Sequence, residues 1–407
     1  MDFEDLYKSL RLPNPPDTKL VLLVLDGVGD IATAETQFKT PLEAAKTPNL
    51  DQVARGSAMG RMIPVYPGVT PGSGPGHLGL FGYDPLDYEV GRGVIEALGV
   101  GIELQGGDVA ARANYCTLDQ QGIVRDRRAG RIPTEVNEKL CEKLRKIKRI
   151  EDTDVIIKAG KSHRFVVVFR GKDIEGPLTD SDPHREGLPI KKVEPVVKSA
   201  KAEKAARLVS LFYGQALPLL AEEKPANGFL LRGIAHMPHI PTFQERFALR
   251  AAAIAVYPMY KGLAQLIGMR KLEGTNTTAE EFQKYLDEYD NFDYFFIHVK
   301  ATDMYGEDGN FEQKTAVIEE VDKVLPILLK KKPTVLAITG DHSTPVPMKG
   351  HSWHPQPVLL HSAVSGSDNL ERFTETHTNR GSLGLFYSKD LIRLMMANAR
   401  LFDKFGA

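Results

Sequence analysis

The stretch Val21-Leu-Leu-Val-Leu25-Asp26-Gly27 decides the fold. Five consecutive apolar residues that end in a turn predict a strand buried on both faces, as in a parallel sheet covered by helices. Two more apolar runs of this kind, at 294–299 and 334–339, flank a predicted helix at about 311–330. Short apolar runs that alternate with longer helical stretches predict an α/β fold, a mostly parallel sheet with helices on both faces.

The middle of the chain has a different character. From about residue 106 to 227 it is richer in Arg and Lys, with short strands predicted at 155–157 and 165–169 and a helix at about 198–213. The glycine-rich stretch 99–107 is where the chain is expected to cross into this region. We therefore predict an α/β domain formed by residues 1–105 and 242–407, with an α+β domain of residues 106–241 inserted in it.

The composition excludes several classes of protein. The 407 residues carry 52 Lys and Arg against 53 Asp and Glu, whereas a general nucleic-acid binder needs a basic surface. The apolar runs are too short to span a bilayer, and no signal-peptide pattern opens the chain. The two cysteines lack the spacing of a disulfide framework or a CxxC motif. We expect a cytoplasmic protein that acts on a small molecule, without nucleic-acid or membrane partners; a homo-oligomer is compatible with the sequence.

Acidic and imidazole side chains gather where the predicted strands end. Asp26 follows the first strand, Asp341 and His342 follow the strand at 334–339, and Asp303 lies just past the strand at 294–299. Open α/β sheets bind ligands outside the carboxyl ends of their strands. Carboxylates brought together without matching bases are costly unless divalent cations neutralise them. The mixed oxygen and imidazole set favours Mn²⁺ or Zn²⁺ over Mg²⁺.

A serine between glycines is the candidate nucleophile. In Pro71-Gly-Ser73-Gly-Pro-Gly-His77 the glycines permit close approach by a ligand, and the apolar run that follows predicts a helix whose N-terminus favours a phosphate. A metal ion bound to the Ser73 hydroxyl would lower the pKa of that hydroxyl and activate it. Taken alone, the motif could also be an ordinary turn.

Together these motifs resemble the alkaline-phosphatase superfamily and, more narrowly, the archaeal-type, cofactor-independent phosphoglycerate mutases. The narrower resemblance rests on Gly91-Arg-Gly93, Arg112-Ala-Asn114, Asp126-Arg-Arg-Ala-Gly-Arg131, Asn227 with Arg232-Gly233, and Lys300-Ala-Thr-Asp303. It implies an alkaline-phosphatase-like metal-binding domain with an inserted substrate-binding cap. It also implies an isomerase of glycolysis and gluconeogenesis that interconverts 3- and 2-phosphoglycerate through a phosphoserine intermediate, without bisphosphoglycerate.

The resemblance further implies two divalent metal ions, with Mn²⁺ favoured and Zn²⁺, Co²⁺ and Mg²⁺ as alternatives. One ion would be held by Asp26, Ser73, Asp341 and His342, and the other by Asp303, Glu307 and His351. Position 307 departs from the family, which usually has histidine there, although a glutamate still offers oxygen ligands. His351 is chosen over His354 because of the Pro-x-Pro that follows. A second departure is Gly74-Pro75-Gly76, where many members carry an acidic and a small residue.

A phosphoglycerate carries two anionic groups, so its site needs cations as well as metals. Arginine binds a carboxylate through two parallel hydrogen bonds. The candidates for substrate binding are Arg112, Arg127, Arg128, Arg131, His163, Arg164, His184, Arg232 and Lys261. Asp126 is the candidate general base for the glycerate hydroxyls, with His163 as the alternative.

Two other functions stay open at this stage. A metal-dependent phosphatase, or another phosphosugar mutase of the superfamily, would share the metal ligands and differ in the inserted domain. A non-catalytic, metal-binding regulatory protein is the other alternative, because Glu307 and Gly74 break the family pattern.

Overall fold

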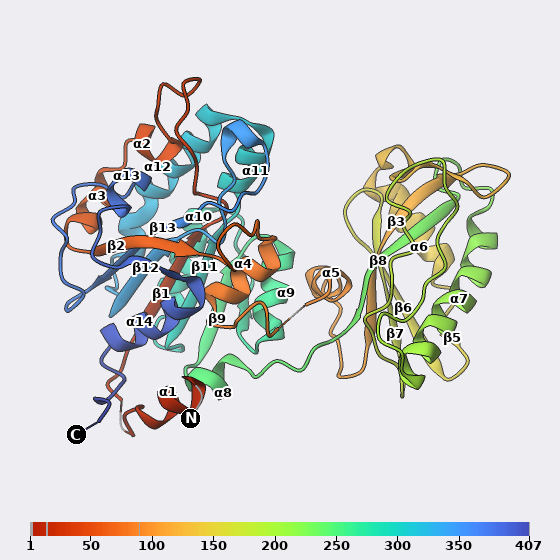
Figure 1. Cartoon of the computed structure of the whole chain (residues 1–407), viewed down its shortest axis with the longest axis horizontal. Coiled ribbons are helices and arrows are strands. Elements are labelled where there is room, and N and C mark those ends of the chain that lie inside the picture. The colour runs from red at the N-terminus through yellow and green to blue at the C-terminus, as the bar shows by residue number, and fades with distance from the viewer. Residues whose placement is uncertain (1–2, 14, 89, 407) are drawn as a thin grey trace. The chain divides into compact units, whose positions relative to one another are not determined.

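The computed structural model describes residues 3–13, 15–88 and 90–406, with side chains from residue 5 onward (Figure 1). It divides into two compact units, and each is described by itself. Unit 1 comprises the residues up to 89 and from 240 onward, and unit 2 comprises residues 90–239.

The units divide at 89/90, whereas the sequence analysis placed the first crossing at 105/106. Helix α5 (Arg92–Gly99) packs on strand β3 (Val109–Leu118) and therefore belongs to unit 2. Gly93 permits this packing, since a Cβ atom there would lie 2.2 Å from the carbonyl oxygen of Ala110. The second crossing, at 239/240, lies two residues before the predicted one.

Unit 1 is built on one large sheet. Its order is β10 (Arg270–Leu272), β9 (Ala251–Ala255), β11 (Tyr294–Val299), β1 (Leu20–Leu25), β12 (Val335–Thr339), β13 (Gln356–Ser362), β2 (Ala58–Ile63) and β14 (Gly384–Tyr387). All neighbours are parallel except β13, which runs antiparallel to β12 and β2. The three strands expected from apolar runs are β1, β11 and β12, and they lie side by side. The prediction of a mostly parallel sheet is confirmed.

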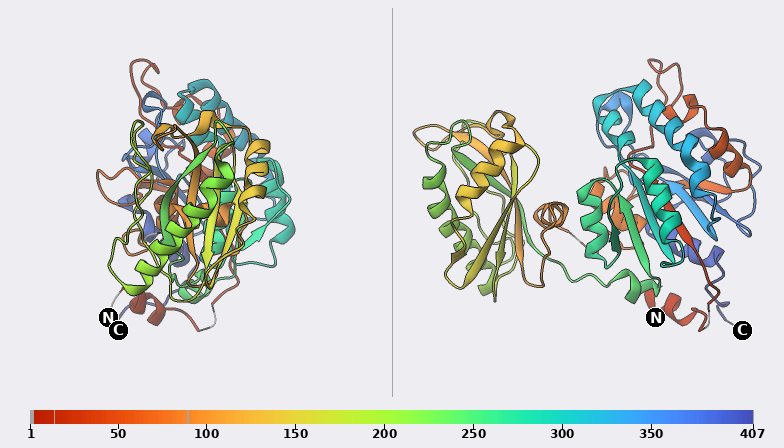
Figure 2. Two further views of the ribbon diagram at one scale, coloured as in Figure 1. Left: turned by 90° about the vertical axis from the view of Figure 1, so that its right-hand side faces the viewer. Right: turned by 180° about the vertical axis from the view of Figure 1, so that it is seen from behind.

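Helices lie on both sides of this sheet, as Figure 2 shows. Every residue of β1 is buried, because a strand covered on both faces has no solvent side. The helices of unit 1 are α1 (Phe3–Ser9), α2 (Pro41–Ala44), α3 (Pro48–Arg55), α4 (Ser73–Leu80), α8 (Phe243–Phe247), α9 (Pro258–Leu266), α10 (Thr278–Glu288), α11 (Ala301–Asp308), α12 (Phe311–Leu328), α13 (Glu375–Thr378) and α14 (Leu391–Asn398). Among the described residues, no helix is both long and apolar enough to cross a membrane.

Unit 2 is an antiparallel sheet with helices, so the predicted α+β class of the insertion is confirmed. Its strands run in the order β4 (Val124–Asp126), β3, β7 (Arg164–Arg170), β6 (Thr153–Ala159) and β5 (Arg149–Ile150). A further strand, β8 (Gly228–His236), also pairs with β3. Alternate residues of β3 and β7 pack in one apolar core with α6 (Thr134–Leu144) and α7 (Ala200–Leu220). The residues between them lie on the opposite face of the sheet.

Candidate metal centre and anion-binding cluster

The three neighbouring strands of unit 1 bring the predicted metal ligands together. Asp26 follows β1, and Asp341 and His342 follow β12 with one glycine between. Asp303 lies in the first turn of α11, directly after β11. Because these strands are adjacent and parallel, their carboxyl ends lie at one edge of the sheet. All four side chains are buried.

Three of them form the first ligand group, Asp26, Asp341 and His342. His342 Nε2 lies 3.1 Å from Asp341 Oδ2 and 3.4 Å from Asp26 Oδ1. Both of these carboxylate oxygens are buried and lack a hydrogen-bond partner among the described residues. Burial raises the pKa of the Asp341 carboxyl, but the charges of His342 and His77 outweigh it and hold that pKa below its ordinary value. His77 Nδ1 also lies 3.1 Å from Asp341 Oδ2. Buried anionic oxygens without a hydrogen bond, beside imidazole nitrogens, fit a divalent cation.

The second ligand group comprises Asp303, His342 and His351. His351 Nε2 lies 3.6 Å from Asp303 Oδ1, and the rings of His342 and His351 stack with their centroids 3.6 Å apart. His351 Nδ1 donates to the carbonyl oxygen of Pro71 over 3.0 Å, which leaves Nε2 free to bind a metal. His342 is thus shared between two groups, an arrangement that the sequence analysis did not foresee.

Glu307 and His354 lie farther from the centre of the second ligand group. Glu307 Oε1 is 3.8 Å from His351 Nε2, and the Glu307 side chain is 56% exposed, so it lies at the rim of the second ligand group. The alternative residue, His354, instead approaches Ser352 Oγ at 2.9 Å and belongs to neither group. The geometry favours His351, the residue that the sequence analysis chose.

Ser73 is the first residue of α4, where the sequence predicted a helix start. Its Oγ lies 3.4 Å from His342 Nε2, and the side chain is half-buried. Gly76 lets the helix approach the end of β12, because a Cβ atom there would lie 2.7 Å from the carbonyl oxygen of Asp341. The hydroxyl therefore lies next to the first ligand group at a helix N-terminus.

Lys300 also belongs to this site, although the sequence motif that contains it predicted no role for it. Its ammonium donates to Asp26 Oδ2 over 3.0 Å and to Asp303 Oδ2 over 2.5 Å, so it joins carboxylates of both ligand groups. Burial lowers the pKa of Lys300, but the two carboxylates outweigh it and hold that pKa above its ordinary value. The position of Lys300, one residue after β11 and three before Asp303, could have indicated from the sequence that it lies near the metal ligands. His298 of β11 is also buried, with Nε2 3.1 Å from Asp26 Oδ2.

Unit 2 places three of the predicted arginines on one face of its sheet. Arg112 of β3 is the register partner of Arg232 on β8, and Arg164 of β7 is the partner of Asn114. This arginine cluster of Arg112, Arg164 and Arg232 lies on the face opposite the apolar core, as strand alternation requires. The Nε atom of each is buried and has no hydrogen-bond partner among the described residues.

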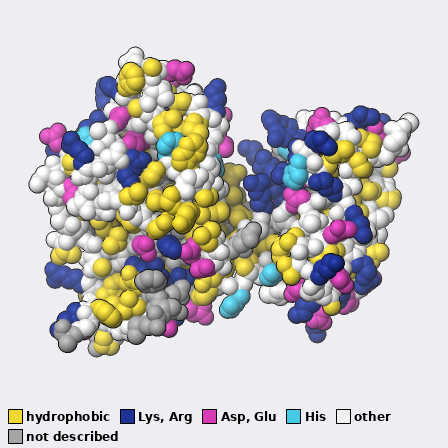
Figure 3. Space-filling view, in the orientation of Figure 1, with side chains coloured by type: hydrophobic (Ala, Val, Ile, Leu, Met, Phe, Trp, Pro, Cys, Tyr) yellow, Lys and Arg dark blue, Asp and Glu magenta, His cyan; other side chains and the backbone are white. Residues whose placement is uncertain are grey.

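The electrostatics of this cluster favour an anion. Burial lowers the pKa of Arg112, and the charges of Arg164 and Arg232 act in the same direction. Burial and the neighbouring arginines, Arg164 first, lower the pKa of His163 to about 4, so this imidazole is neutral at neutral pH. On the surface of unit 2, Figure 3 shows a patch of Lys and Arg side chains together with His. Carboxylates also lie near the cluster: Asp180 and Asp182 are 3.7 and 3.6 Å from Arg232 Nε, and the charge of Glu96 opposes the lowered pKa of Arg112. Crowded guanidinium groups whose Nε atoms have no hydrogen-bond partner among the described residues suit an anionic ligand.

The other candidates in unit 2 have partners within the unit. Arg127 donates two hydrogen bonds, of 2.9 and 2.8 Å, to the buried carboxylate of Asp182. The Asp126 carboxylate accepts the backbone N–H groups of Arg128, over 2.7 Å, and of Gly130, over 2.5 Å, and so shapes its own turn. Its oxygens keep further lone pairs for a substrate hydroxyl.

The last candidates are more exposed or lie in unit 1. Arg128 and Arg131 are exposed, and both contribute to the lowered pKa of His163. His184 is about half exposed, with Nε2 3.7 Å from Asp180. Lys261 lies on α9 of unit 1, where it pairs with Glu273 over 2.7 Å.

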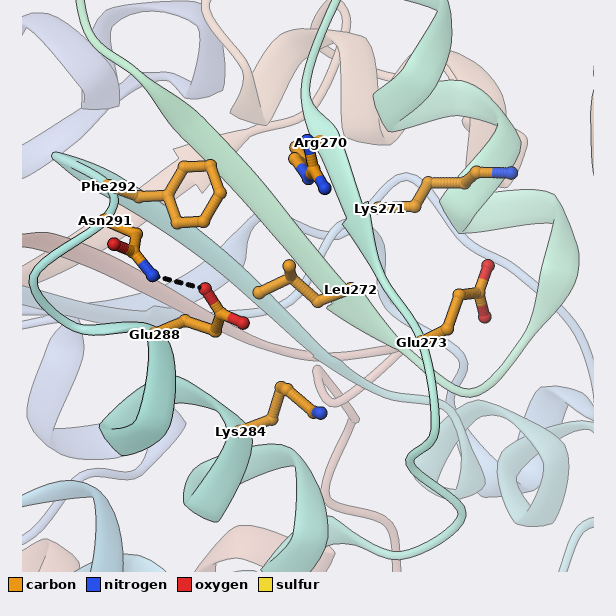
Figure 4. A pocket seen from close by; sticks show the side chains of 8 residues that line it. All are labelled: Arg270, Lys271, Leu272, Glu273, Lys284, Glu288, Asn291 and Phe292. Carbon is orange, nitrogen blue, oxygen red and sulfur yellow. Dashed lines mark hydrogen bonds between the residues drawn. The ribbon is translucent and has the colours of Figure 1, made fainter.

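A groove of about 500 Å³ runs along β10 and α10 (Figure 4). Arg270, Lys271, Lys284 and Glu288 are among its lining residues, and Asn291 donates a hydrogen bond to Glu288 there. It contains none of the predicted site residues, so it does not coincide with the metal centre.

Comparison with known proteins identifies the family. Residues 54–227 match the family model of 2,3-bisphosphoglycerate-independent phosphoglycerate mutase. A probable 2,3-bisphosphoglycerate-independent phosphoglycerate mutase of Thermotoga neapolitana is 48% identical over 398 residues, 98% of each chain. The chain belongs to this mutase family. The resemblance found in the sequence is confirmed, and so is the prediction of an isomerase.

A further relative and two solved structures match nearly the whole chain. A relative of the same name from Thermus thermophilus is 48% identical, with both chains completely covered. The solved structure of a cofactor-independent phosphoglycerate mutase from Thermoplasma acidophilum has a TM-score of 0.75 and 31% identity, covering 94% of this chain and 100% of that one. The PH0037 protein of Pyrococcus horikoshii has a TM-score of 0.81 and 30% identity, with coverages of 96% and 100%.

Proposed function

We propose that this chain interconverts 3- and 2-phosphoglycerate by passing the phosphoryl group through Ser73, without bisphosphoglycerate. One observation carries the proposal. A serine hydroxyl at a helix N-terminus lies 3.4 Å from His342 Nε2, beside buried carboxylate oxygens that lack hydrogen bonds within the described residues. Relatives named as probable mutases at 48% identity support this reading of the site.

The proposed site holds two divalent cations, with Mn²⁺ favoured. The first ligand group with Ser73 would hold one ion, and the second ligand group with Glu307 would hold the other. Such ions, when bound, would neutralise the phosphate oxygens and lower the pKa of the serine hydroxyl. This centre accounts for the buried oxygens of Asp26 and Asp341, which are otherwise costly.

The protein's own residues carry the transfer. Ser73 Oγ attacks phosphorus, the bond from phosphorus to the glycerate 3-oxygen breaks, and that oxygen takes up a proton. The 2-hydroxyl then loses its proton and attacks the phosphoserine, and Ser73 Oγ leaves. N–H groups at the start of α4 stabilise the phosphoryl oxygens. Between the two transfers the glycerate must be retained and water excluded, or the phosphoserine would hydrolyse.

The arginine cluster binds the glycerate carboxylate in this proposal. Guanidinium groups orient a carboxylate through paired hydrogen bonds, and the buried Nε atoms of Arg112, Arg164 and Arg232 have no hydrogen-bond partner among the described residues. Asp126 is the favoured base for the glycerate hydroxyls. The alternative, His163, is a weak base because its pKa is lowered to about 4.

Activity of chelator-stripped protein tests the proposal. The protein is assayed for interconversion of the two phosphoglycerates and for phosphate release, with Mn²⁺, Zn²⁺, Co²⁺ or Mg²⁺ added back and no bisphosphoglycerate present. We expect interconversion with at least one metal and little free phosphate. Phosphate release without interconversion would identify a phosphatase instead. Failure of every metal to restore activity would contradict the proposed metal site.

A further inference from the structure

Lys314 on α12 is a fully buried lysine outside the two ligand groups. Its ammonium lies 2.8 Å from Asp30 Oδ2, and both side chains are 0% exposed. It also donates to the carbonyl oxygens of Gly27 and Thr344, each over 2.9 Å. A longer contact of 3.5 Å reaches the carbonyl oxygen of Gly29, so these partners engage all three donors of the ammonium group. Lysine is rarely buried completely unless it is paired. The buried ammonium of Lys314 therefore fixes the backbone at Gly27 and Thr344 in one arrangement.

The contacts of Lys314 join the two loops that carry the first ligand group, Asp26, Asp341 and His342. One loop, residues 26–30, follows β1, and the other, residues 341–346, follows β12. The same loops also meet directly, since Thr344 N donates to the carbonyl oxygen of Gly27 over 3.2 Å and Val346 N donates to Asp30 Oδ2 over 3.1 Å. Lys314 lies beneath this junction and neutralises the buried charge of Asp30.

The two residues whose carbonyl oxygens Lys314 binds, Gly27 and Thr344, also orient metal ligands through other groups. Gly27 N donates to Asp341 Oδ1 over 3.1 Å, while Asp341 Oδ2 lies 3.1 Å from both His342 Nε2 and His77 Nδ1. Thr344 Oγ1 lies 3.0 Å from His342 Nδ1 and donates to Asp303 Oδ1 over 2.5 Å. The spacing is tight, because a Cβ atom on Gly27 would lie 2.4 Å from Thr344 Oγ1.

We propose that Lys314 is a positioning residue that sets the metal affinity of the site by clamping these two loops together. The inference rests on the metal site of the proposed function, and it adds a residue that touches neither metal nor substrate. Removal of the ammonium frees the carbonyl oxygens of Gly27 and Thr344, so Asp341, His342 and Asp303 lose their fixed orientation. Residues that orient metal ligands in this way change metal affinity by about 10- to 100-fold when removed.

Calorimetric titration of chelator-stripped protein with Mn²⁺ tests the proposal. Lys314→Met keeps the length of the side chain and removes its donors. We expect Mn²⁺ to bind this variant at least about tenfold more weakly than the wild type. At saturating Mn²⁺ most of kcat should return, with the KM for 3-phosphoglycerate unchanged. The matched control is Lys323→Met, an exposed lysine on the same helix, which should bind Mn²⁺ as the wild type does.

The thermal midpoint of the metal-free proteins separates positioning from folding. A lower midpoint with an unchanged Mn²⁺ affinity would overturn the proposal, because it would make Lys314 a purely structural residue. If Lys314→Met does not fold, the double variant Lys314→Met with Asp30→Asn removes the unpaired buried charge. Wild-type affinity in that folded double variant would also overturn the proposal. If the wild type itself binds no Mn²⁺, the metal site of the proposed function fails, which is a different result.

Discussion

Two carboxylate oxygens, Asp26 Oδ1 and Asp341 Oδ2, define what the metal centre can hold. Each is buried without a hydrogen bond from the described residues, and such a burial costs free energy unless a cation compensates it. Their residue types and positions after strands could be read from the sequence. The sharing of His342 could not, because it depends on side-chain directions that strand positions do not determine.

The substitution Glu307→Gln tests the rim of the second ligand group. The side chain is 56% exposed and 3.8 Å from His351, so its charge is partly screened by solvent. We expect the weaker Mn²⁺ binding step to become about fivefold weaker, with the stronger step unchanged. Titration calorimetry resolves the two steps. Glu312→Gln, exposed at the start of α12, is the control, and an equal effect in both variants would contradict a role for Glu307 as a ligand.

The lowered pKa of His163 predicts how stability depends on pH. Burial and the nearby arginines bring this pKa to about 4, so the folded protein excludes a proton that the unfolded chain binds below about 6.5. The resulting contribution is fully present above pH 6.5 and is lost as pH falls toward 4. Between pH 7 and 5 the free energy of unfolding should fall less in His163→Asn than in the wild type. Urea denaturation measures this, and parallel curves would contradict it.

At the scale of elements, the helix after the nucleophile and the ends of three strands make the site. The strands were predictable because buried parallel strands are continuous apolar runs. The glycine-rich stretch 99–107 predicts the first crossing between units, but the units divide before α5, because Gly93 permits close packing of this helix on β3. The pairing of Arg112 with Arg232 could not be predicted from the sequence, since the register of a strand depends on partner strands that are distant along the chain.

Gly76→Ala tests the close approach of α4 to β12. The added methyl group would lie 2.7 Å from the carbonyl oxygen of Asp341, so the helix must shift and carry Ser73 away from His342. We expect kcat to fall about 100-fold, as positional errors of about 1 Å do elsewhere. The control is Gly72→Ala, whose Cβ has its nearest neighbour at 3.8 Å. Equal kcat values for the two variants in a mutase assay would contradict this view of the helix.

At the scale of the whole molecule, the near-neutral charge of the chain divides between two units. Unit 1 gathers carboxylates at the ends of its strands, and unit 2 gathers arginines on one face of its sheet. The pattern of elements predicted an α/β domain with an inserted α+β domain, and the motifs predicted a different ligand for each. The proposed reaction assigns the phosphoryl group to unit 1 and the glycerate carboxylate to unit 2.

Arg112→Met separates substrate binding from stability in unit 2. Removal of this guanidinium relieves its burial and its repulsion by Arg164 and Arg232 but also removes its attraction to Glu96, so the free energy of unfolding should change little. The KM for 3-phosphoglycerate should rise at least about tenfold, with Mn²⁺ affinity unchanged. Steady-state kinetics and urea denaturation measure the two effects. Arg125→Met, an exposed arginine of the same unit, is the control, and an unchanged KM in Arg112→Met would contradict the role of the cluster.

Acid quenching during turnover tests the central claim most directly. Metal-loaded enzyme is mixed with 3-phosphoglycerate, quenched within one turnover and digested, and its peptides are sequenced by mass spectrometry. The account predicts a phosphoryl group on Ser73 and none in Ser73→Ala, which should retain measurable Mn²⁺ binding but no mutase activity. Full activity of Ser73→Ala, or turnover of the wild type with phosphate on another residue, would contradict it.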